Sequence, residues 1–274
     1  MSDPAERRAF LVGALGGVTL GGAGGFFSGR EAGSLPALKP GQAWFALPKE
    51  AKPTFAQQGE DVVVAEILQD EVHNQSPTYV DIGAWDPISG SNTYLLYRQG
   101  FRGVLVEPNP TFAAKLREVR PRDTVVEAGI GDNEQETLVD YYVIDWGGGQ
   151  CNTFSKGQAD ALSRRFGRNM VQRVLKRPMM HVNKLLAKYF PSGGPDFFSV
   201  DAEGFDYTIL KGLDFERFRP QVICAETAIL DGLVEENIID LVKAKDYEVR
   251  GGSYLNTVFF DHRLLEKALR EQLR

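Results

Sequence analysis

Short apolar runs alternate with helix-length segments through the middle of the chain. Five of these runs are too short for buried helices and are rich in β-branched or aromatic residues, which is the pattern of buried strands. They cover residues 78–83, 103–108, 124–130, 196–201 and 221–226. The segments between several of them carry helix start and stop signals, at residues 92–99, 110–118 and 205–211. This alternation predicts a mostly parallel sheet with helices on both faces.

Further elements are predicted on either side of this pattern. Thr54 stands where a capping residue would begin a helix over residues 55–69, ahead of the first strand. After a helix predicted over residues 235–245, two apolar runs flank Gly251 and Gly252, which is the signal of a hairpin. The predicted fold class is therefore α/β, a doubly wound and mostly parallel sheet closed by an antiparallel C-terminal hairpin.

The amino-terminal segment has a different pattern. Residues 10–27 carry no charge and are rich in glycine, and Arg7 and Arg8 stand just before them. Two arginines ahead of a moderately apolar core resemble a twin-arginine export signal. The segment is also just long enough to span a bilayer, so a cleaved signal and a membrane anchor are both open at this point.

The domain organisation follows from this pattern and from composition. Residues 1–33 form the signal or anchor, and residues 34–53, with four prolines, read as a linker. Residues 54–274 remain for one domain, since a chain of 274 residues with 43% hydrophobic content can bury one large core. The net charge of -6 argues against broad nucleic-acid binding. Two cysteines outside any cysteine or histidine cluster predict neither a zinc site nor a disulfide framework.

Acidic residues finish four of the predicted strands. Asp81, Glu107 and Glu226 each lie at the end of an apolar run, and the fourth run ends in Asp201 with Glu203 two residues on. In an open α/β sheet, ligands bind beyond the carboxyl ends of the strands. We therefore expect these acids to gather around a ligand site.

The acid at the end of the second strand indicates what that ligand is. A carboxylate in the position of Glu107 accepts hydrogen bonds from the ribose hydroxyls of an adenosine, in nicotinamide and in S-adenosylmethionine sites alike. A dinucleotide also needs a glycine-rich turn for its pyrophosphate, whereas Gly83 is followed by Trp85, Asp86 and Pro87. S-adenosylmethionine has no phosphate, and its ammonium would favour Asp81 or Asp86. The turn therefore favours S-adenosylmethionine.

Seven motifs extend this pattern over residues 55–260. Together they resemble the FkbM family of methyltransferases, and the set is far more specific than any one member. The motifs are AQQGED (56–61), VDIGAWDP (80–87), SNT (91–93), GVLVEPNP (103–110), RPRD (120–123), SVDAEGFD (199–206) and RPQVICAE (219–226). The resemblance implies a Rossmann-like class I methyltransferase fold. It also implies S-adenosyl-L-methionine as cofactor and a hydroxyl of a glycan or small-molecule natural product as acceptor.

Asp201 and Glu203 are the candidate catalytic residues. The cofactor's methyl group is already activated, so the protein must mainly align the acceptor oxygen and take up its proton. Asp201 and Glu203 can act as base and orienting partner, or Asp201 can hold the cofactor's ammonium while Glu203 faces the acceptor. Asn92 and Glu226 are candidates for acceptor binding. Carboxylates alone are poor grounds for a metal ion, so no metal is predicted.

A basic segment interrupts the sheet pattern between residues 145 and 195. It carries Arg164, Arg165 and Arg168, with no acid between residues 161 and 190, in an otherwise acidic protein. We expect this insertion to cap the active site and to favour an anionic acceptor, such as a phosphorylated or acidic glycan, or a membrane headgroup surface. A solvated basic helix face is the alternative.

Two rival functions remain at this point. A nicotinamide-dependent oxidoreductase is compatible with Glu107 but not with the acidic turn. An exported, non-catalytic binding module on the same fold would account for Arg7 and Arg8. We expect a protein that is exported or attached to a membrane through residues 10–27, with the cytoplasmic side favoured for an active enzyme, because the cofactor is made there.

Overall fold

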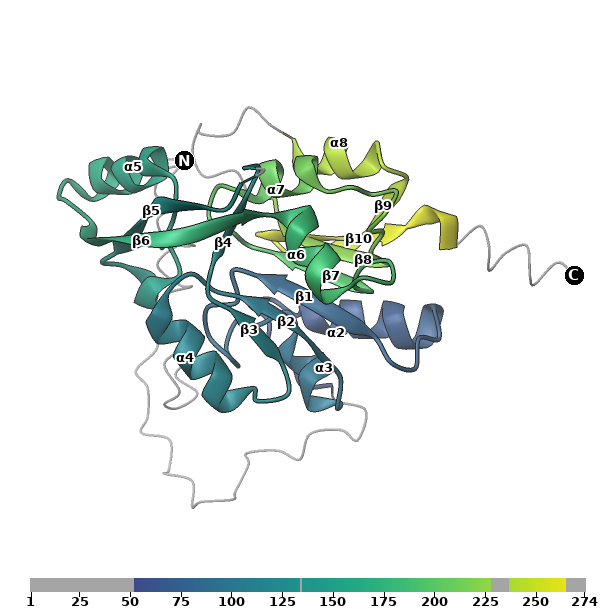
Figure 1. The fold of residues 1–274 in the computed structure, drawn as a ribbon. Helices are drawn as coiled ribbons and strands as arrows, with labels where there is room; N and C mark the ends of the chain where they lie inside the picture. Colours follow the sequence, from purple (N-terminus) through teal and green to yellow (C-terminus); the bar gives the residue numbers. More distant parts are fainter. Residues whose placement is uncertain (1–51, 134, 228–236, 265–274) are drawn as a thin grey trace, which may run out of the picture. The chain divides into compact units, whose positions relative to one another are not determined.

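A computed structural model describes residues 52–133, 135–227 and 237–264 (Figure 1). They belong to one compact unit, Lys52–Arg274. The predicted signal or anchor and most of the predicted linker lie outside the described residues. Within the described ranges, no helix combines the length and the apolar character that crossing a bilayer requires.

A seven-stranded sheet forms the centre of the unit, in the order β3-β2-β1-β7-β8-β10-β9. Its strands are β1 (Thr78–Ile82), β2 (Arg102–Val106), β3 (Thr124–Val126), β7 (Phe197–Val200), β8 (Val222–Glu226), β9 (Tyr247–Gly252) and β10 (Asn256–Asp261). The strands from β3 to β8 run parallel, with Val80 opposite Val104 on one side and Phe198 on the other. Strand β10 pairs antiparallel with both β8 and β9. The predicted fold class is confirmed, including the antiparallel hairpin.

Helices cover both faces of this sheet (Figure 1). They are α2 (Glu60–Glu66) with its π-helical extension η1 (Ile67–Glu71), α3 (Tyr94–Arg98), α4 (Pro110–Val119), α6 (Val182–Tyr189), α7 (Asp206–Gly212) and α8 (Ile238–Lys243). On one face Leu68, Leu96 and Leu116 of η1, α3 and α4 pack around Tyr79. On the other face Val80 lies in a second core cluster with residues of α6, α7 and α8. Both sheet faces are therefore buried, as a parallel sheet requires.

Most predicted elements shift by a few residues at their ends, and two differ more substantially. The first helix begins at Glu60 rather than at residue 55, because Gly59 takes a left-handed conformation and the Asp61 carboxylate accepts from the Thr54 hydroxyl and the Phe55 amide. The third predicted strand, residues 124–130, is split. Its first part is β3, and its second part, β4 (Gly129–Gly131), belongs to another sheet.

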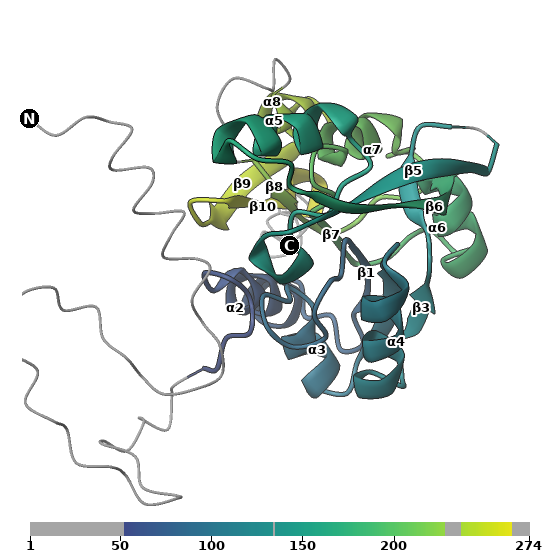
Figure 2. The same cartoon turned by 90° about the vertical axis from the view of Figure 1, so that its left-hand side faces the viewer.

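That second sheet has three strands, in the order β4-β6-β5, with β5 at Thr137–Ile144 and β6 at Val171–His181. The helix α5 (Lys156–Phe166) packs on it through Ala159, which lies in a small core with Ile144 and Met170 (Figure 2). The basic insertion of residues 145–195 is thus a helix, a strand and a helix: α5, β6 and α6. Strands β5 and β6 were not predicted from the sequence.

Candidate functional site

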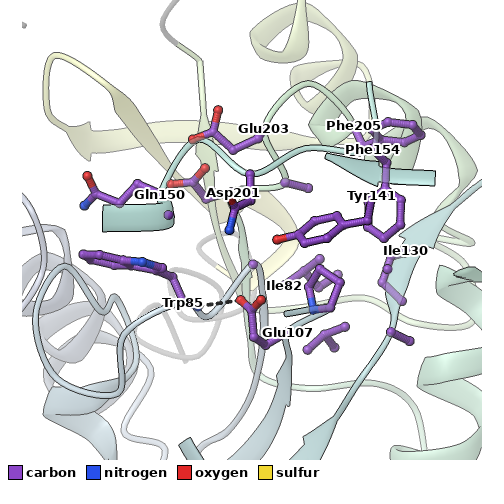
Figure 3. Close-up of a pocket in the computed structure, with 18 residues that line it drawn as sticks. Ile82, Trp85, Glu107, Ile130, Tyr141, Gln150, Phe154, Asp201, Glu203 and Phe205 are labelled. Carbon is purple, nitrogen blue, oxygen red and sulfur yellow. Dashed lines mark hydrogen bonds between the residues drawn. The ribbon is translucent and has the colours of Figure 1, made fainter. Parts of the chain in front are cut away.

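A pocket opens at the carboxyl ends of β1, β2 and β7, between the main sheet and the three-stranded sheet. Its volume is about 490 Å³, part of it open to solvent. Trp85, Glu107 and Tyr141 surround the same space, with Asp201 and Glu203 beside it (Figure 3). The lining residues are Ile82, Gly83, Trp85, Val106, Glu107, Pro108, Ala128, Gly129, Ile130, Tyr141, Gly149, Gln150, Asn152, Phe154, Asp201, Ala202, Glu203 and Phe205.

Gly83 lets two strand ends approach each other at the floor of the pocket. It has a φ of +86°, and a Cβ at this position would lie 1.8 Å from the carbonyl oxygen of Asp201. Its amide donates to the carbonyl oxygen of Val106 at 3.0 Å. Only glycine satisfies both the backbone conformation and the close approach, so this residue fixes how the ends of β1, β2 and β7 meet.

Glu107 presents a buried carboxylate to the pocket. Its side chain accepts from the backbone amides of Trp85 at 3.0 Å and Asn109 at 2.6 Å, and the residue is 3% exposed. Asn109 in turn caps α4 by accepting from the Thr111 amide. Burial raises the pKa of Glu107 to about 7, against the opposing effect of the two amides. Each carboxylate oxygen accepts one amide and keeps a further lone pair for a ligand.

Asp201 and Glu203 stand together at the end of β7. Burial raises the pKa of Asp201 to about 7, and the charge of Asp206 adds to the effect. Burial also raises the pKa of Glu203 well above its usual range, with the charges of Asp201 and Asp206 next in importance. The Asp206 carboxylate accepts from the amides of Ala202 and Gly204. Asp206, not Glu203, therefore accepts from the backbone amides ahead of α7.

The opposite wall comes from the three-stranded sheet and its loops. Tyr141 on β5 is 2% exposed, and burial followed by the charge of Glu107 raises its pKa. Asn152 accepts from the Ile144 amide through Oδ1. Phe154 packs on Tyr141 with ring centroids 4.8 Å apart. This wall was not predicted from the sequence, although the alternating aromatic and β-branched residues of 137–144 are typical of a strand.

A glycine turn borders the pocket beside Trp85. Gly147, Gly148 and Gly149 all have positive φ, between +62° and +95°. The Trp85 indole Nε1 donates to the carbonyl oxygen of Gly148 at 3.2 Å, and a Cβ on Gly149 would lie 2.6 Å from the Phe112 ring. Trp85, which belongs to the acidic turn after β1, therefore also connects the main sheet to the glycine turn of the insertion.

Three predicted site residues near the first strand do not line the pocket. Asp81 is 5% exposed, and its carboxylate accepts from the Thr93 hydroxyl at 2.6 Å. Asp86 pairs with Lys115 at 2.6 Å. Asn92 lies buried against Ser199 and Cys224. Of the predicted cofactor-binding residues, the structure brings Gly83, Glu107 and Asp201 together in the pocket and leaves Asp81 and Asp86 outside its lining.

The predicted acceptor residues are more dispersed. Arg164 and Arg165 are exposed in the last turn of α5, and Arg168 follows that helix and pairs with Asp145 at 3.1 Å. Glu226 is half-buried at the end of β8. Burial raises the pKa of Glu226, and the charges of Asp201 and Glu203 raise it further. Glu226 therefore interacts electrostatically with two acids that line the pocket. In the described part of the chain, no group of three His, Cys, Asp or Glu side chains is arranged to hold a metal ion.

The strand order and the position of the pocket define a Rossmann-like fold of the class I methyltransferase type. The family model described as the methyltransferase FkbM domain matches residues 81–249, more than half of the chain. The chain therefore belongs to the FkbM methyltransferase family, as the motifs indicated. No curated protein matches it.

Several solved structures resemble the fold weakly. A TehB-like SAM-dependent methyltransferase from Corynebacterium glutamicum shares 11% identity, with 74% of this chain and 88% of that chain covered and a TM-score of 0.39. An O-methyltransferase from Bacillus cereus in complex with SAH shares 12% identity, with 78% and 83% covered and a TM-score of 0.39. The 1,6-didemethyltoxoflavin-N1-methyltransferase of Burkholderia thailandensis shares 11% identity, with 74% and 77% covered and a TM-score of 0.35.

Proposed function

We propose that this protein transfers a methyl group from S-adenosylmethionine to a hydroxyl of a small molecule or glycan. The observation that carries the proposal is the buried Glu107 carboxylate, which faces the pocket beside a turn without the glycines that a pyrophosphate needs. The family supports methyl transfer. The cofactor and the acceptor are our inference.

The residues of the pocket suit this cofactor. Glu107 has lone pairs left for the ribose hydroxyls, and Gly83 leaves room beside the backbone. Asp201 and Glu203 offer negative charge to a ligand that carries a sulfonium and an ammonium. Pro108, Ile130 and other apolar residues supply surface for an aromatic base.

The chain's own residues then have separate tasks. When bound, the cofactor supplies a methyl group that is already activated. Asp201, whose pKa is raised to about 7, holds a proton-accepting carboxylate at the pH where a general base is most effective. Glu203 stands beside it and can orient the acceptor hydroxyl or take its proton. Tyr141 and Phe154 keep water away from the opposite side of the pocket.

The acceptor of this proposal carries a negative charge at some distance from the reacting hydroxyl. Arg164 and Arg165 end α5 on the surface, and neither makes an ion pair with any described residue, whereas Arg168 is paired. We expect changes of Arg164 and Arg165 to glutamine to weaken acceptor binding and to leave cofactor affinity unchanged. Equal acceptor affinity in the variant would remove this part of the proposal. Export or membrane attachment through residues 10–27 stays a prediction.

Calorimetric titration of the whole chain tests the cofactor. We expect S-adenosylmethionine to bind and a nicotinamide dinucleotide not to bind. The Glu107→Ala variant should lose affinity about 10-fold or more, since a hydrogen bond to a charged group contributes about 1.5–3 kcal/mol. Asp86→Asn is the matched control, because Asp86 lies near the turn but does not line the pocket. Preference for the dinucleotide would favour an oxidoreductase, and binding of neither would favour a non-catalytic module.

A further inference from the structure

The loop that carries Glu203 is held by two side chains from outside the main sheet. The Thr153 hydroxyl donates to the backbone carbonyl oxygen of Glu203 at 2.8 Å. The Gln158 Nε2 donates to the Glu203 Oε2 at 3.3 Å. The Thr153 hydroxyl has one proton, so it donates either to the Glu203 carbonyl oxygen or to the Gln158 Oε1, which lies 3.1 Å away. We call Thr153 and Gln158 the α5 clamp, since they lie just before and at the start of α5.

The backbone at Glu203 needs such support. Glu203 has a φ of +49°, in the left-handed region that residues with a side chain rarely adopt. A conformation of this kind persists where the surroundings over-determine it. The next residue, Gly204, has a φ of +96°, and a Cβ there would lie 2.6 Å from the Gln158 Oε1. Gln158 therefore packs directly on the backbone of the strained loop.

The clamp contacts the pocket lining at Glu203. Neither Thr153 nor Gln158 is among the residues that line the pocket, whereas Glu203 is. Among the described residues, the amide of Gln158 makes the only hydrogen bond to the Glu203 carboxylate. Because an N–H donor stabilises a carboxylate in its charged form, this bond favours the state of Glu203 that can accept a proton.

We propose that Gln158 is a positioning residue that holds the Glu203 carboxylate beside the pocket and favours its charged form. The inference rests on the proposed function, in which Glu203 lies at the reacting end of the pocket. The insertion would then do more than line the pocket, because Gln158 of α5 would influence the protonation of Glu203 after β7.

Glu203 needs this donor because its other ionisable neighbours are acids or groups that become negative. Burial comes first among the causes that raise its pKa, and the charges of Asp201 and Asp206 follow. Arg165 on α5 acts on the neighbouring Cys151. The ionisable groups that interact with Glu203 are Asp201 after β7, Asp206 of α7, Glu226 of β8, Tyr141 of β5 and Cys151.

A carboxyl titration of the intact protein tests the inference without any acceptor. The protein is labelled with ¹³C at glutamate carboxyls, and the Glu203 signal is assigned by its loss in Glu203→Gln. We expect Gln158→Met, which keeps the length of the side chain but removes the donor, to raise the titration midpoint of Glu203 by about half a pH unit or more. Asp160→Asn, at the ion pair with Lys156 on the same helix, should leave the midpoint unchanged.

A second variant keeps the test possible if Gln158→Met does not fold. Gln158→Glu keeps the shape and adds a like charge, so it should raise the midpoint further than Gln158→Met. An unchanged Glu203 midpoint in either folded variant overturns the inference. Calorimetry with S-adenosylmethionine separates the two proposals, because Gln158 does not line the pocket. If S-adenosylmethionine does not bind but the Glu203 midpoint shifts, the proposed function is refuted and the role of Gln158 is supported.

Discussion

The main sheet and the three-stranded sheet hold their charges in different ways. In the main sheet's layer, Arg120 and Asp123 form an ion pair in which both side chains are 0% exposed. In the three-stranded sheet, Asp140 and Lys176 pair across β5 and β6 with side chains 43% and 65% exposed. A buried pair must stay complete, because either charge alone is costly to bury. An exposed pair contributes little. We call the main sheet with this buried ion pair the frame, whereas the compared ion pair of the smaller sheet is exposed to water.

The same contrast runs through the pocket. Glu107 and Asp201 extend from strand ends of the frame, and Tyr141 and Phe154 belong to the smaller sheet and its loops. A ligand in the pocket would therefore contact residues of both sheets. Gln158 crosses between the two.

The largest effect is expected from breaking the buried frame. The Arg120 guanidinium donates to Asp123 at 2.8 Å, and also to the hydroxyls of Tyr79 and Thr93. We expect Arg120→Met to lower the free energy of unfolding by about 3–5 kcal/mol in urea denaturation, because Asp123 would be left buried without its partner. Adding Asp123→Leu should recover part of the loss. A loss below about 1 kcal/mol would show that the frame does not depend on this pair.

The frame was largely predictable from the sequence. A strand buried on both faces is a continuous apolar run, and the residue that ends it is read directly from the chain. Gly83, Glu107, Asp201 and Glu203 were found in this way, and all four line the pocket. Asp81 ends its strand in the same pattern, but its side chain accepts from Thr93 instead. Sequence position locates a strand end but does not say which way a side chain points.

The smaller sheet was not predicted, for a physical reason. Strand β6 carries Arg173, Lys176 and Arg177 and is exposed along much of its length, so it reads as a solvated basic segment. Its pairing with β5 joins residues far apart in sequence. The α5 clamp was missed for the same reason, since Gln158 and Glu203 are 45 residues apart. The SNT and RPRD motifs signalled the family, and in the structure they supply Thr93 and Arg120 to the buried frame.

A smaller effect concerns the pH dependence of the frame. The pKa of Glu107 is raised to about 7 in the folded protein, from 4.5 in an unfolded chain. The folded state therefore holds the proton more tightly, and stability is lost as pH rises from about 4.5 through 7. We expect Glu107→Gln to remove this loss, which amounts to about 3 kcal/mol. Urea denaturation of the ligand-free proteins between pH 4.5 and 8 measures it. Parallel curves for the two proteins would contradict the raised pKa.

The smallest effect is expected in the three-stranded sheet. Asp140→Asn removes the partner of Lys176 at a distance of 2.7 Å, but both groups are well exposed to water. The free energy of unfolding should fall by less than about 1 kcal/mol, and less still in high salt, because water and ions already screen the pair. Cofactor affinity should stay the same, since neither residue lines the pocket. A loss as large as that of Arg120→Met would mean that the smaller sheet is held by charge as firmly as the main one, and the contrast between them would fail.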